Sequence, residues 1–88
     1  MLHLGGGHIL PRQSVILILD YQKAVENPDT SLFLKTWQAH ASVRDISGGK
    51  PKSIVVSSYR GEDSLTYSPI SSVTLARRSV HIGDEYEH

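Results

Sequence analysis

The pentapeptide Val15-Ile16-Leu17-Ile18-Leu19 is the longest uninterrupted apolar run in this chain of 88 residues. Most of its side chains are β-branched, and apolar residues occupy both the odd and the even positions. This pattern is typical of a strand covered on both faces, here by the chain's own helix or by a neighbouring subunit. The run is far shorter than the roughly 20 residues needed to cross a bilayer, so we expect no membrane-spanning segment.

A helix is predicted downstream of this strand, over Pro28 to Ala41. Asn27-Pro28-Asp29 is typical of a helix start, because Asn caps free backbone N–H groups and Pro fits the first helical position. The apolar residues of this helix recur three and four positions apart, at Phe33, Leu34, Trp37 and Ala41. We expect this helix to be the main cover of the sheet. The polar segment from Asp20 to Glu26 fits either a connection or a helical turn.

The rest of the chain predicts short strands and one short helix. The expected strands are residues 1–4, 8–10, 43–46, 53–58 and 65–67, and the expected helix is Val73 to Arg78. Gly5-Gly6-Gly7 and Arg60-Gly61-Glu62-Asp63 are predicted turns. The resulting order is β-β-β-α-β-β-β-α, an α+β fold of small antiparallel sheets with one main helix and a short C-terminal helix. We expect a single domain over 1–82 and an acidic, disordered tail over 83–88.

Composition and charge exclude several classes of protein. Nine basic and nine acidic residues give a formal net charge of zero, which argues against a strong nucleic-acid binder. Three of the acids lie in the last five residues, so residues 1–82 carry nine basic and six acidic residues, a net charge of +3. The absence of cysteine excludes a disulfide framework, a thiolate metal site and a cysteine nucleophile. The N-terminal residues have neither the basic nor the apolar region of a secretory signal, so we expect a cytoplasmic protein.

No motif for catalysis, metal binding or cofactor binding is found. Gly5-Gly6-Gly7 is not a dinucleotide-binding turn, because Leu10 stands where the fingerprint needs its third Gly. The five histidines, none of them at metal-ligand spacing, are His3, His8, His40, His81 and His88. His3 and His8 flank the glycine turn and are expected at an edge or surface. We therefore expect no enzyme, no metal and no cofactor.

The basic residues make the electrostatic case for an anionic partner. Lys50 and Lys52 flank Pro51 in a glycine loop, which favours a projecting pair of cations that contacts phosphate oxygens. Arg77-Arg78 close the predicted short helix, and Arg12 lies in a turn. We predict that these five cations contact DNA, with an ordinary solvated surface as the alternative.

Oligomerisation has separate support. A strand that is apolar on both faces is hard to cover with one good helix and one short one, and short strands leave edges open to pairing. We predict a homo-oligomer, a closed ring or a dimer, with Val15, Leu17 and Ile18 at the interface.

Four blocks of sequence, in the same order, resemble the RemB type of the RemA/RemB family of small bacterial extracellular-matrix regulatory proteins. The blocks are His3-Leu4-Gly5-Gly6, Val15 to Asp20, Asp45-Ile46-Ser47-x-Gly49-Lys50-Pro51-Lys52-Ser53, and Ser68-Pro69-Ile70-Ser71-Ser72-x-Thr74-Leu75. The resemblance covers nearly the whole chain, roughly Met1 to Arg78, and leaves the acidic tail outside.

This resemblance implies a DNA-binding transcriptional regulator of matrix genes that assembles into a ring-shaped homo-oligomer. In the RemA branch, adjacent arginines contact DNA from a loop that corresponds here to Ser47 to Lys52, so the resemblance assigns that contact to Lys50 and Lys52. The lysines of this chain flank a proline, and lysine lacks the planar fork of arginine. Another cation of that branch falls at Ser14, with Arg12 the nearest substitute.

Two functions stay open on the sequence. The first is a regulator of biofilm matrix genes, a homo-oligomeric ring that contacts the DNA backbone. The second is an oligomeric, non-enzymatic scaffold that binds a protein partner, such as a related regulator, without contacting DNA. The near-neutral charge and the acidic tail favour the scaffold, and the loop that carries Lys50 and Lys52 favours DNA.

Overall fold

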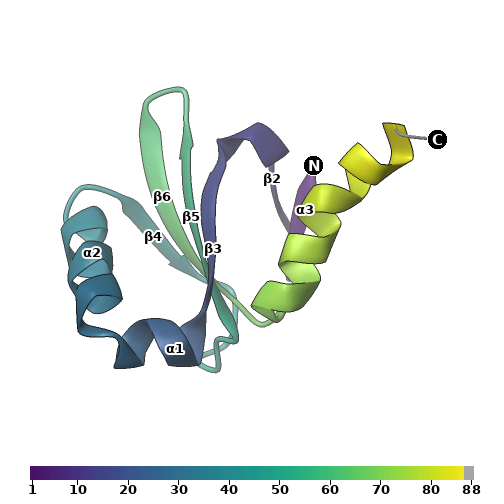
Figure 1. Ribbon diagram of the computed structural model, residues 1–88. Helices are drawn as coiled ribbons and strands as arrows, with labels where there is room; N and C mark the ends of the chain where they lie inside the picture. Colours follow the sequence, from purple (N-terminus) through teal and green to yellow (C-terminus); the bar gives the residue numbers. More distant parts are fainter. Residues whose placement is uncertain (87–88) are drawn as a thin grey trace.

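A four-stranded sheet separates two covering layers, one of helices and one made of a β-hairpin and a helix (Figure 1). The computed structural model describes residues 1–86, with side chains described as far as residue 79. The strands are β1 Leu2–Gly5, β2 His8–Leu10, β3 Val15–Asp20, β4 Ser42–Asp45, β5 Ser53–Tyr59 and β6 Glu62–Ser68. The helices are the 3₁₀ turn η1 Arg12–Ser14, then α1 Tyr21–Glu26, α2 Pro28–Gln38 and α3 Ser72–Tyr86. The predicted α+β class is confirmed, and the strands follow in the predicted order, but two helices, α1 and α2, stand between β3 and β4 where the sequence predicts one main helix.

The large sheet has the order β3-β5-β6-β4. β5 pairs antiparallel with both β3 and β6, but β4 pairs parallel with β6, so this sheet is mixed and not wholly antiparallel as expected. The cause lies in the loop after β4, which passes the end of β6 before β5 begins. Ile46 N–H donates to Tyr67 O, and Lys52 N–H donates to Ser68 O, which holds both ends of this loop against β6.

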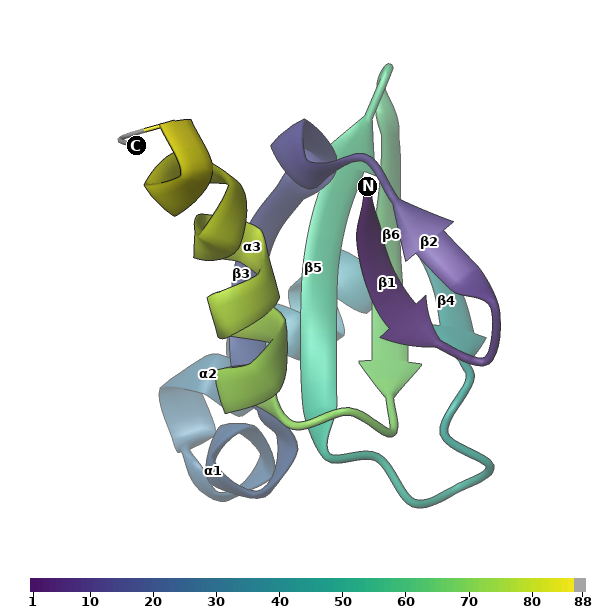
Figure 2. The same ribbon diagram turned by 90° about the vertical axis from the view of Figure 1, so that its right-hand side faces the viewer.

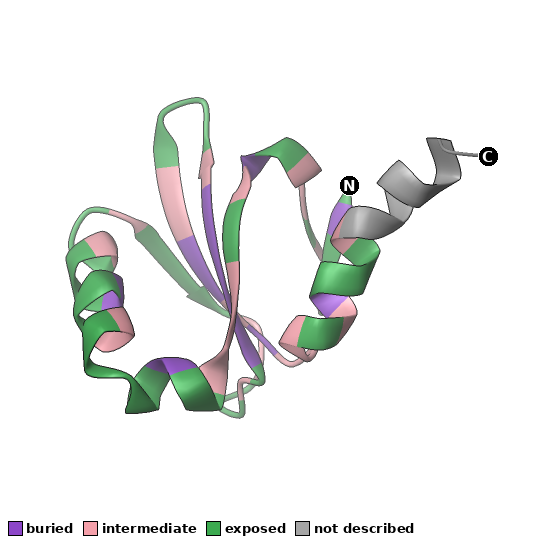
Figure 3. Ribbon diagram, viewed as in Figure 1, coloured by how far each residue is buried: buried purple, intermediate pink, exposed green. Residues whose placement is uncertain are grey.

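β3 lies at an edge of the sheet, although its apolar sequence predicts a strand covered on both faces. Its one partner strand is β5. Ile16 is 53% exposed and Leu17 is 41% exposed, because α1 packs near the end of β3 and leaves its middle uncovered (Figure 3). The chain's own helices therefore do not supply the second cover that the sequence requires.

The helical layer begins with two well-capped helices. Asp20 Oδ2 accepts a hydrogen bond from Lys23 N–H at the start of α1. Asn27 Oδ1 accepts from both Asp29 N–H and Thr30 N–H at the start of α2, as its sequence predicts. The polar segment before Asn27 is thus a helix, and α2 ends at Gln38, earlier than the expected Ala41.

Each face of the sheet has its own apolar core. Against the helical layer the buried residues are Ala24, Leu34, Ile54, Val56 and Leu65, joined by partly buried Leu19, Tyr21, Trp37 and Tyr67. On the opposite face the buried residues are Leu2, Leu4, Val55 and Leu75, contributed by β1, β5 and α3. Figure 2 shows β1, β2 and α3 in front of the sheet on this second face. We call the two sides the helix face and the hairpin face.

The β1–β2 hairpin is fixed to the C-terminal part of the chain. Ser68 Oγ donates to Leu4 O at 2.6 Å, and Arg78 Nη1 donates to His3 O at 3.0 Å. Gly5 has φ +105°, and a Cβ there would lie 3.1 Å from Pro69, so glycine is required for the close approach of this turn.

The helix α3 extends well beyond the Arg78 at which the sequence predicts its end. It includes residues 83–86 of the segment expected to form a disordered tail, and residues 87–88 lie outside the described residues.

Candidate nucleic-acid interface

Three of the five predicted DNA-binding cations line one pocket. This pocket, of about 280 Å³, is lined by residues from the start of β1, the turn η1 and the middle of α3. Figure 2 shows these three elements on the hairpin side of the sheet. Its described lining residues are Met1, Leu2, His3, Arg12, Arg77 and Arg78. We call Arg12, Arg77 and Arg78 the arginine cluster. None of the described lining residues carries a carboxylate, so nothing in this described lining neutralises the three guanidinium groups.

The arginine cluster is held by the fold in different ways. Arg77 and Arg78 are both exposed, and Arg78 is also held by its hydrogen bond to His3 O. Arg12 lies in η1, where Ser14 Oγ and Ser14 N–H both donate to Pro11 O and close the turn. The Arg12 Nε atom is buried and has no hydrogen-bond partner among the described residues. A buried donor without an acceptor is rare in folded proteins.

Lys50 and Lys52 lie at the other end of the sheet. Gly48 and Gly49 both have positive φ, which turns the loop outward and leaves both lysine side chains exposed. The backbone of Lys52 is bonded on both sides, to Tyr21 N–H at 3.1 Å and to Ser68 O at 2.8 Å. Its position is therefore fixed while its side chain reaches solvent.

An acidic residue also stabilises this lysine loop. The carboxylate of Asp45 accepts from both the Oγ and the backbone N–H of Ser47. These hydrogen bonds hold the pKa of Asp45 below its usual range. Asp45 thus brings a negative charge close to the loop that carries Lys50.

The predicted cations consequently form two groups and not one patch. Arg12 precedes β3, and Lys52 is bonded to Tyr21, which follows β3. A strand of this length separates the two groups by about 20 Å at about 3.3 Å per residue. Sequence reasoning could not separate them, since the separation depends on the direction of β3 in the sheet.

The three predicted interface residues on β3 have different surroundings. Val15 and Ile18 are partly buried and pack against the core of the hairpin face. Leu17 points to the other face and is exposed together with Ile16. Of the three, Leu17 therefore offers the most apolar surface to a partner.

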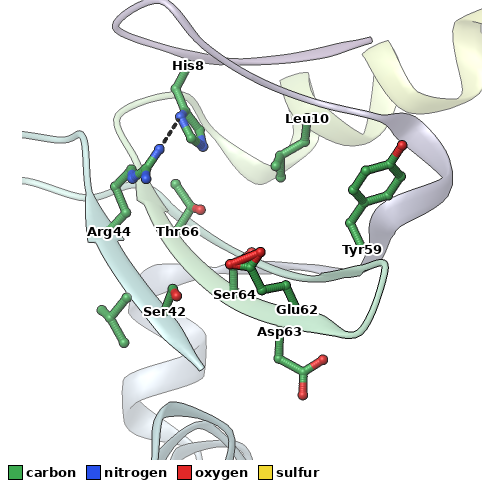
Figure 4. A pocket seen from close by; sticks show the side chains of 10 residues that line it. His8, Leu10, Ser42, Arg44, Tyr59, Glu62, Asp63, Ser64 and Thr66 are labelled. Atoms are coloured by element: carbon green, nitrogen blue, oxygen red, sulfur yellow. Dashed lines mark hydrogen bonds between the residues drawn. The ribbon is translucent and has the colours of Figure 1, made fainter. Parts of the chain in front are cut away.

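A second pocket lies on the hairpin face and was not found by sequence reasoning (Figure 4). It has a volume of about 220 Å³ and lies between β2, β4 and the upper part of the β5–β6 hairpin. Its lining residues are His8, Leu10, Ser42, Val43, Arg44, Tyr59, Glu62, Asp63, Ser64 and Thr66. We call it the sheet groove. The signal that could have located it is the alternation of β6, which places Glu62, Ser64 and Thr66 on one face.

Arg44 and His8 form one end of the sheet groove. Arg44 Nη1 donates to His8 Nδ1 at 3.0 Å, the contact dashed in Figure 4. Guanidinium has no acceptor, so His8 Nδ1 must be the unprotonated ring nitrogen. Partial burial, and then the charge of Arg44, lower the pKa of His8 from 6.5, which keeps the imidazole neutral near pH 7.

The described part of the chain has neither a metal cluster nor a membrane span. Among residues 1–79, whose side chains the structure describes, no three His, Cys, Asp or Glu side chains lie close enough together to hold a metal ion. Within the described part of the chain, no helix is both long enough and apolar enough to cross a membrane.

The chain was compared with protein-family models, with curated proteins and with solved structures, and none of the three comparisons found a match.

Proposed function

We propose that this chain is a non-enzymatic regulator that binds double-stranded DNA as a homo-oligomer and contacts the DNA backbone through the arginine cluster. The observation that carries this proposal is the convergence of Arg12, Arg77 and Arg78, from two distant segments, on one pocket without a carboxylate in its described lining. Charges of one sign that gather in a concave site attract ions of the opposite sign.

Arginine suits a phosphate ligand. Its planar group presents donors in a fixed fork that matches two phosphate oxygens, and it stays charged at every physiological pH. The outer nitrogens of such groups in the pocket can bond phosphate oxygens of the backbone.

Lys50 and Lys52 provide a second, weaker contact in this proposal. About 20 Å between the two groups corresponds to about six base-pair steps at 3.4 Å each. One duplex can therefore reach both ends of a subunit. The lysines act as point charges without a fork, so the contact at this end carries little information about base sequence.

The open edges of the sheet support oligomerisation. β3 and β4 are its two edges, and both run antiparallel to β5, so they point in the same direction. The β4 of one subunit can then extend the sheet at the β3 of the next as a parallel neighbour. This head-to-tail contact forms a ring if the rotation closes. Exposed Leu17 would be covered by the added subunit.

The biological role follows from the resemblance described above. We propose that the DNA sites lie in genes for the extracellular matrix of a bacterium and that the protein acts in the cytoplasm.

A scaffold function is the second candidate, and exposed apolar residues of the helical layer favour it. Leu32 is 65% exposed and Phe33 is 38% exposed, both on α2. A protein partner that covers this helix would leave the arginine cluster without a role.

The test is a titration of duplex DNA binding against salt, with the mass of the oligomer measured in the same buffers. Arg77→Ala is the best single variant, because the Arg77 side chain is exposed and its removal leaves the Arg78–His3 bond intact. We expect it to weaken binding of all sequences about equally and to lower the slope of log affinity against log salt by about one unit for each phosphate that is no longer neutralised. The double variant Lys50→Ala with Lys52→Ala should have a smaller effect.

The matched control is Lys23→Ala with Lys35→Ala. These exposed lysines lie on α1 and α2, on the other side of the sheet, and removing them changes the net charge by the same amount as the Lys50/Lys52 pair. If the control variant bound DNA as weakly as the Lys50/Lys52 variant, the change in net charge alone would account for the effect of the two lysines. An intact oligomer that ignores DNA at low salt would refute DNA binding and favour the scaffold.

A further inference from the structure

The sheet groove has two ends of opposite charge. Arg44 pairs in register with Thr66, and Glu62 lies four residues earlier on the same strand and pairs with Tyr59. Four residues of β6 correspond to about 13 Å between the two ends at about 3.3 Å per residue. Figure 4 shows Arg44 and His8 at one side of the groove, with Glu62 and Tyr59 toward the other.

The guanidinium of Arg44 has capacity for an anion. Among the described residues its hydrogen-bond partner is the neutral His8, and the ion pair found there joins His40 and Asp63 instead. Guanidinium has five N–H donors, so one bond to His8 leaves most of them free. The bond also holds the Arg44 side chain at the groove, which lowers the cost of ordering it on binding.

The walls between the two ends suit a short chain with polar and apolar parts. Ser42, Ser64 and Thr66 bring hydroxyl groups, and Leu10 and the ring of Tyr59 bring apolar surface. Thr66 is only 1% exposed and Ser64 is hydrogen-bonded to Ser57, so this floor is rigid. The volume of about 220 Å³ lies below the usual range of drug-sized sites, which starts at about 300 Å³.

We propose that the sheet groove binds a small extended zwitterion, of the length of a dipeptide or of an amino acid whose amino group lies at the far end of its chain, with its carboxylate at Arg44 and its amino group at Glu62. The carboxylate of Glu62 at this end favours a ligand that carries a positive group as well as a carboxylate. Glu62 repels a ligand that is negative along its whole length, so the groove and the arginine cluster accept different ligands. The inference therefore does not depend on DNA binding.

The experiment uses 6-aminohexanoate as the probe, since it carries a carboxylate and an ammonium group at the two ends of a flexible chain. Binding to the full chain is measured by calorimetry and by changes in amide chemical shifts. Hexanoate lacks the ammonium group and hexylamine lacks the carboxylate, so each should bind at least tenfold more weakly. The shifted amides should belong to β2, β4 and β6.

Two variants test the assigned ends. Arg44→Gln should abolish binding of 6-aminohexanoate, and Glu62→Gln should make hexanoate bind about as well as 6-aminohexanoate. Lys35→Gln, on the helical layer, is the matched control and should leave both affinities unchanged. Thermal melting of each variant shows that it is folded.

Equal binding of hexanoate and 6-aminohexanoate by the unmodified chain would overturn the zwitterion assignment. No measurable binding of any of the three probes at about 10 mM, on the order of the weakest affinities of such small ligands, would overturn the site itself. DNA binding by Arg44→Gln at the normal affinity would show that the groove and the arginine cluster are separate, whichever of the two proposals stands.

Discussion

The two faces of β6 show how one strand can build a dry core on one side and a polar surface on the other. Leu65 and Tyr67 point to the helix face and pack against residues of α1 and α2. Ser64, Thr66 and Ser68, which alternate with them, point to the hairpin face. Because side chains alternate strictly along a strand, one residue of displacement would exchange the two surfaces. The alternation thus both fixes the register and creates the sheet groove.

The covers of the two faces differ as well. The helix face is closed by two capped helices, and Trp37 Nε1–H donates to Ser64 O at 3.0 Å across the layer boundary. The hairpin face is covered by the short strands β1 and β2 and by α3, which packs against β3 and β1. This cover does not extend over the upper part of β6 and β4, so the hydroxyl groups there line a groove and are not buried in a core.

Of the substitutions that test this difference between the faces, Leu65→Ala should have the largest effect on stability. Leu65 is fully buried on the helix face, so its truncation should lower the free energy of unfolding by about 2–5 kcal/mol. Urea denaturation measures the change. Leu32→Ala makes the same chemical change at an exposed position of α2 and should alter the free energy by less than about 0.5 kcal/mol. Equal decreases in the two variants would show that the helical layer does not cover β6 as described.

Ser68→Ala should have the next largest effect, although its side chain is polar. Ser68 is buried, its Oγ donates to Leu4 O, and it accepts from Ile70 N–H. Alanine would leave both backbone groups unpartnered, at a cost of about 1–3 kcal/mol in the free energy of unfolding. Ser58→Ala, at a half-buried serine near the end of β5, is the control and should cost less. A Ser68 variant as stable as the natural chain would mean that its bonds do not fix the hairpin.

Thr66→Val tests the hairpin face of β6 at the residue next to Leu65. The Thr66 hydroxyl forms no hydrogen bond with any other described side chain, and valine has nearly the same shape. We expect the free energy of unfolding to change by less than about 1 kcal/mol, with no fixed sign. Chemical denaturation of this variant beside Leu65→Ala gives the test. A decrease as large as that of Leu65→Ala would mean that the hairpin face of β6 is a closed core.

The smallest effect concerns pH and belongs to the hairpin face. The pKa of His8 is lowered from 6.5 by burial and by Arg44, so below pH 6.5 the unfolded chain binds a proton at His8 more readily than the folded chain. The contribution of neutral His8 to the free energy of unfolding should be fully present above pH 6.5 and should decrease as the pH falls toward the lowered pKa. Melting temperatures at pH 7.5 and 5.5 measure this, and the decrease should be smaller in His8→Gln. His3→Gln, at an exposed position of β1, should melt like the natural chain at both pH values, and an unchanged decrease in His8→Gln would contradict the role of His8.

Local signals predicted much of the fold correctly. The cap at Asn27, the glycine turn at Gly5-Gly6-Gly7 and the β5–β6 turn each act within a few residues, so the sequence contains all the information that determines them. The capped start of α1 at Asp20 was left open, because its polar sequence lacks a clear helical stripe.

Non-local pairing explains what the sequence did not predict. The apolar sequence of β3 predicts burial, but nothing in it reveals that β3 lies at an edge of the sheet. Likewise, β4 pairs with β6 and not with β5, which follows it directly in the chain. The sheet groove and the separation of the lysines from the arginine cluster both result from these strand pairings, so neither could be predicted from the order of residues.

The attachment of the N-terminal hairpin to residues near the other end of the described chain has a consequence for how the protein is made. Leu4 and His3 are held by Ser68 and Arg78, at sequence separations of 64 and 75 residues. During synthesis, which adds about 5–20 residues per second, the hairpin leaves the ribosome long before its partners exist. The hairpin is thus translated before its partners but is among the last segments to reach its final position, and contacts of such long range slow folding. Until then the apolar side chains of Leu2 and Leu4 stay open to water and to other chains.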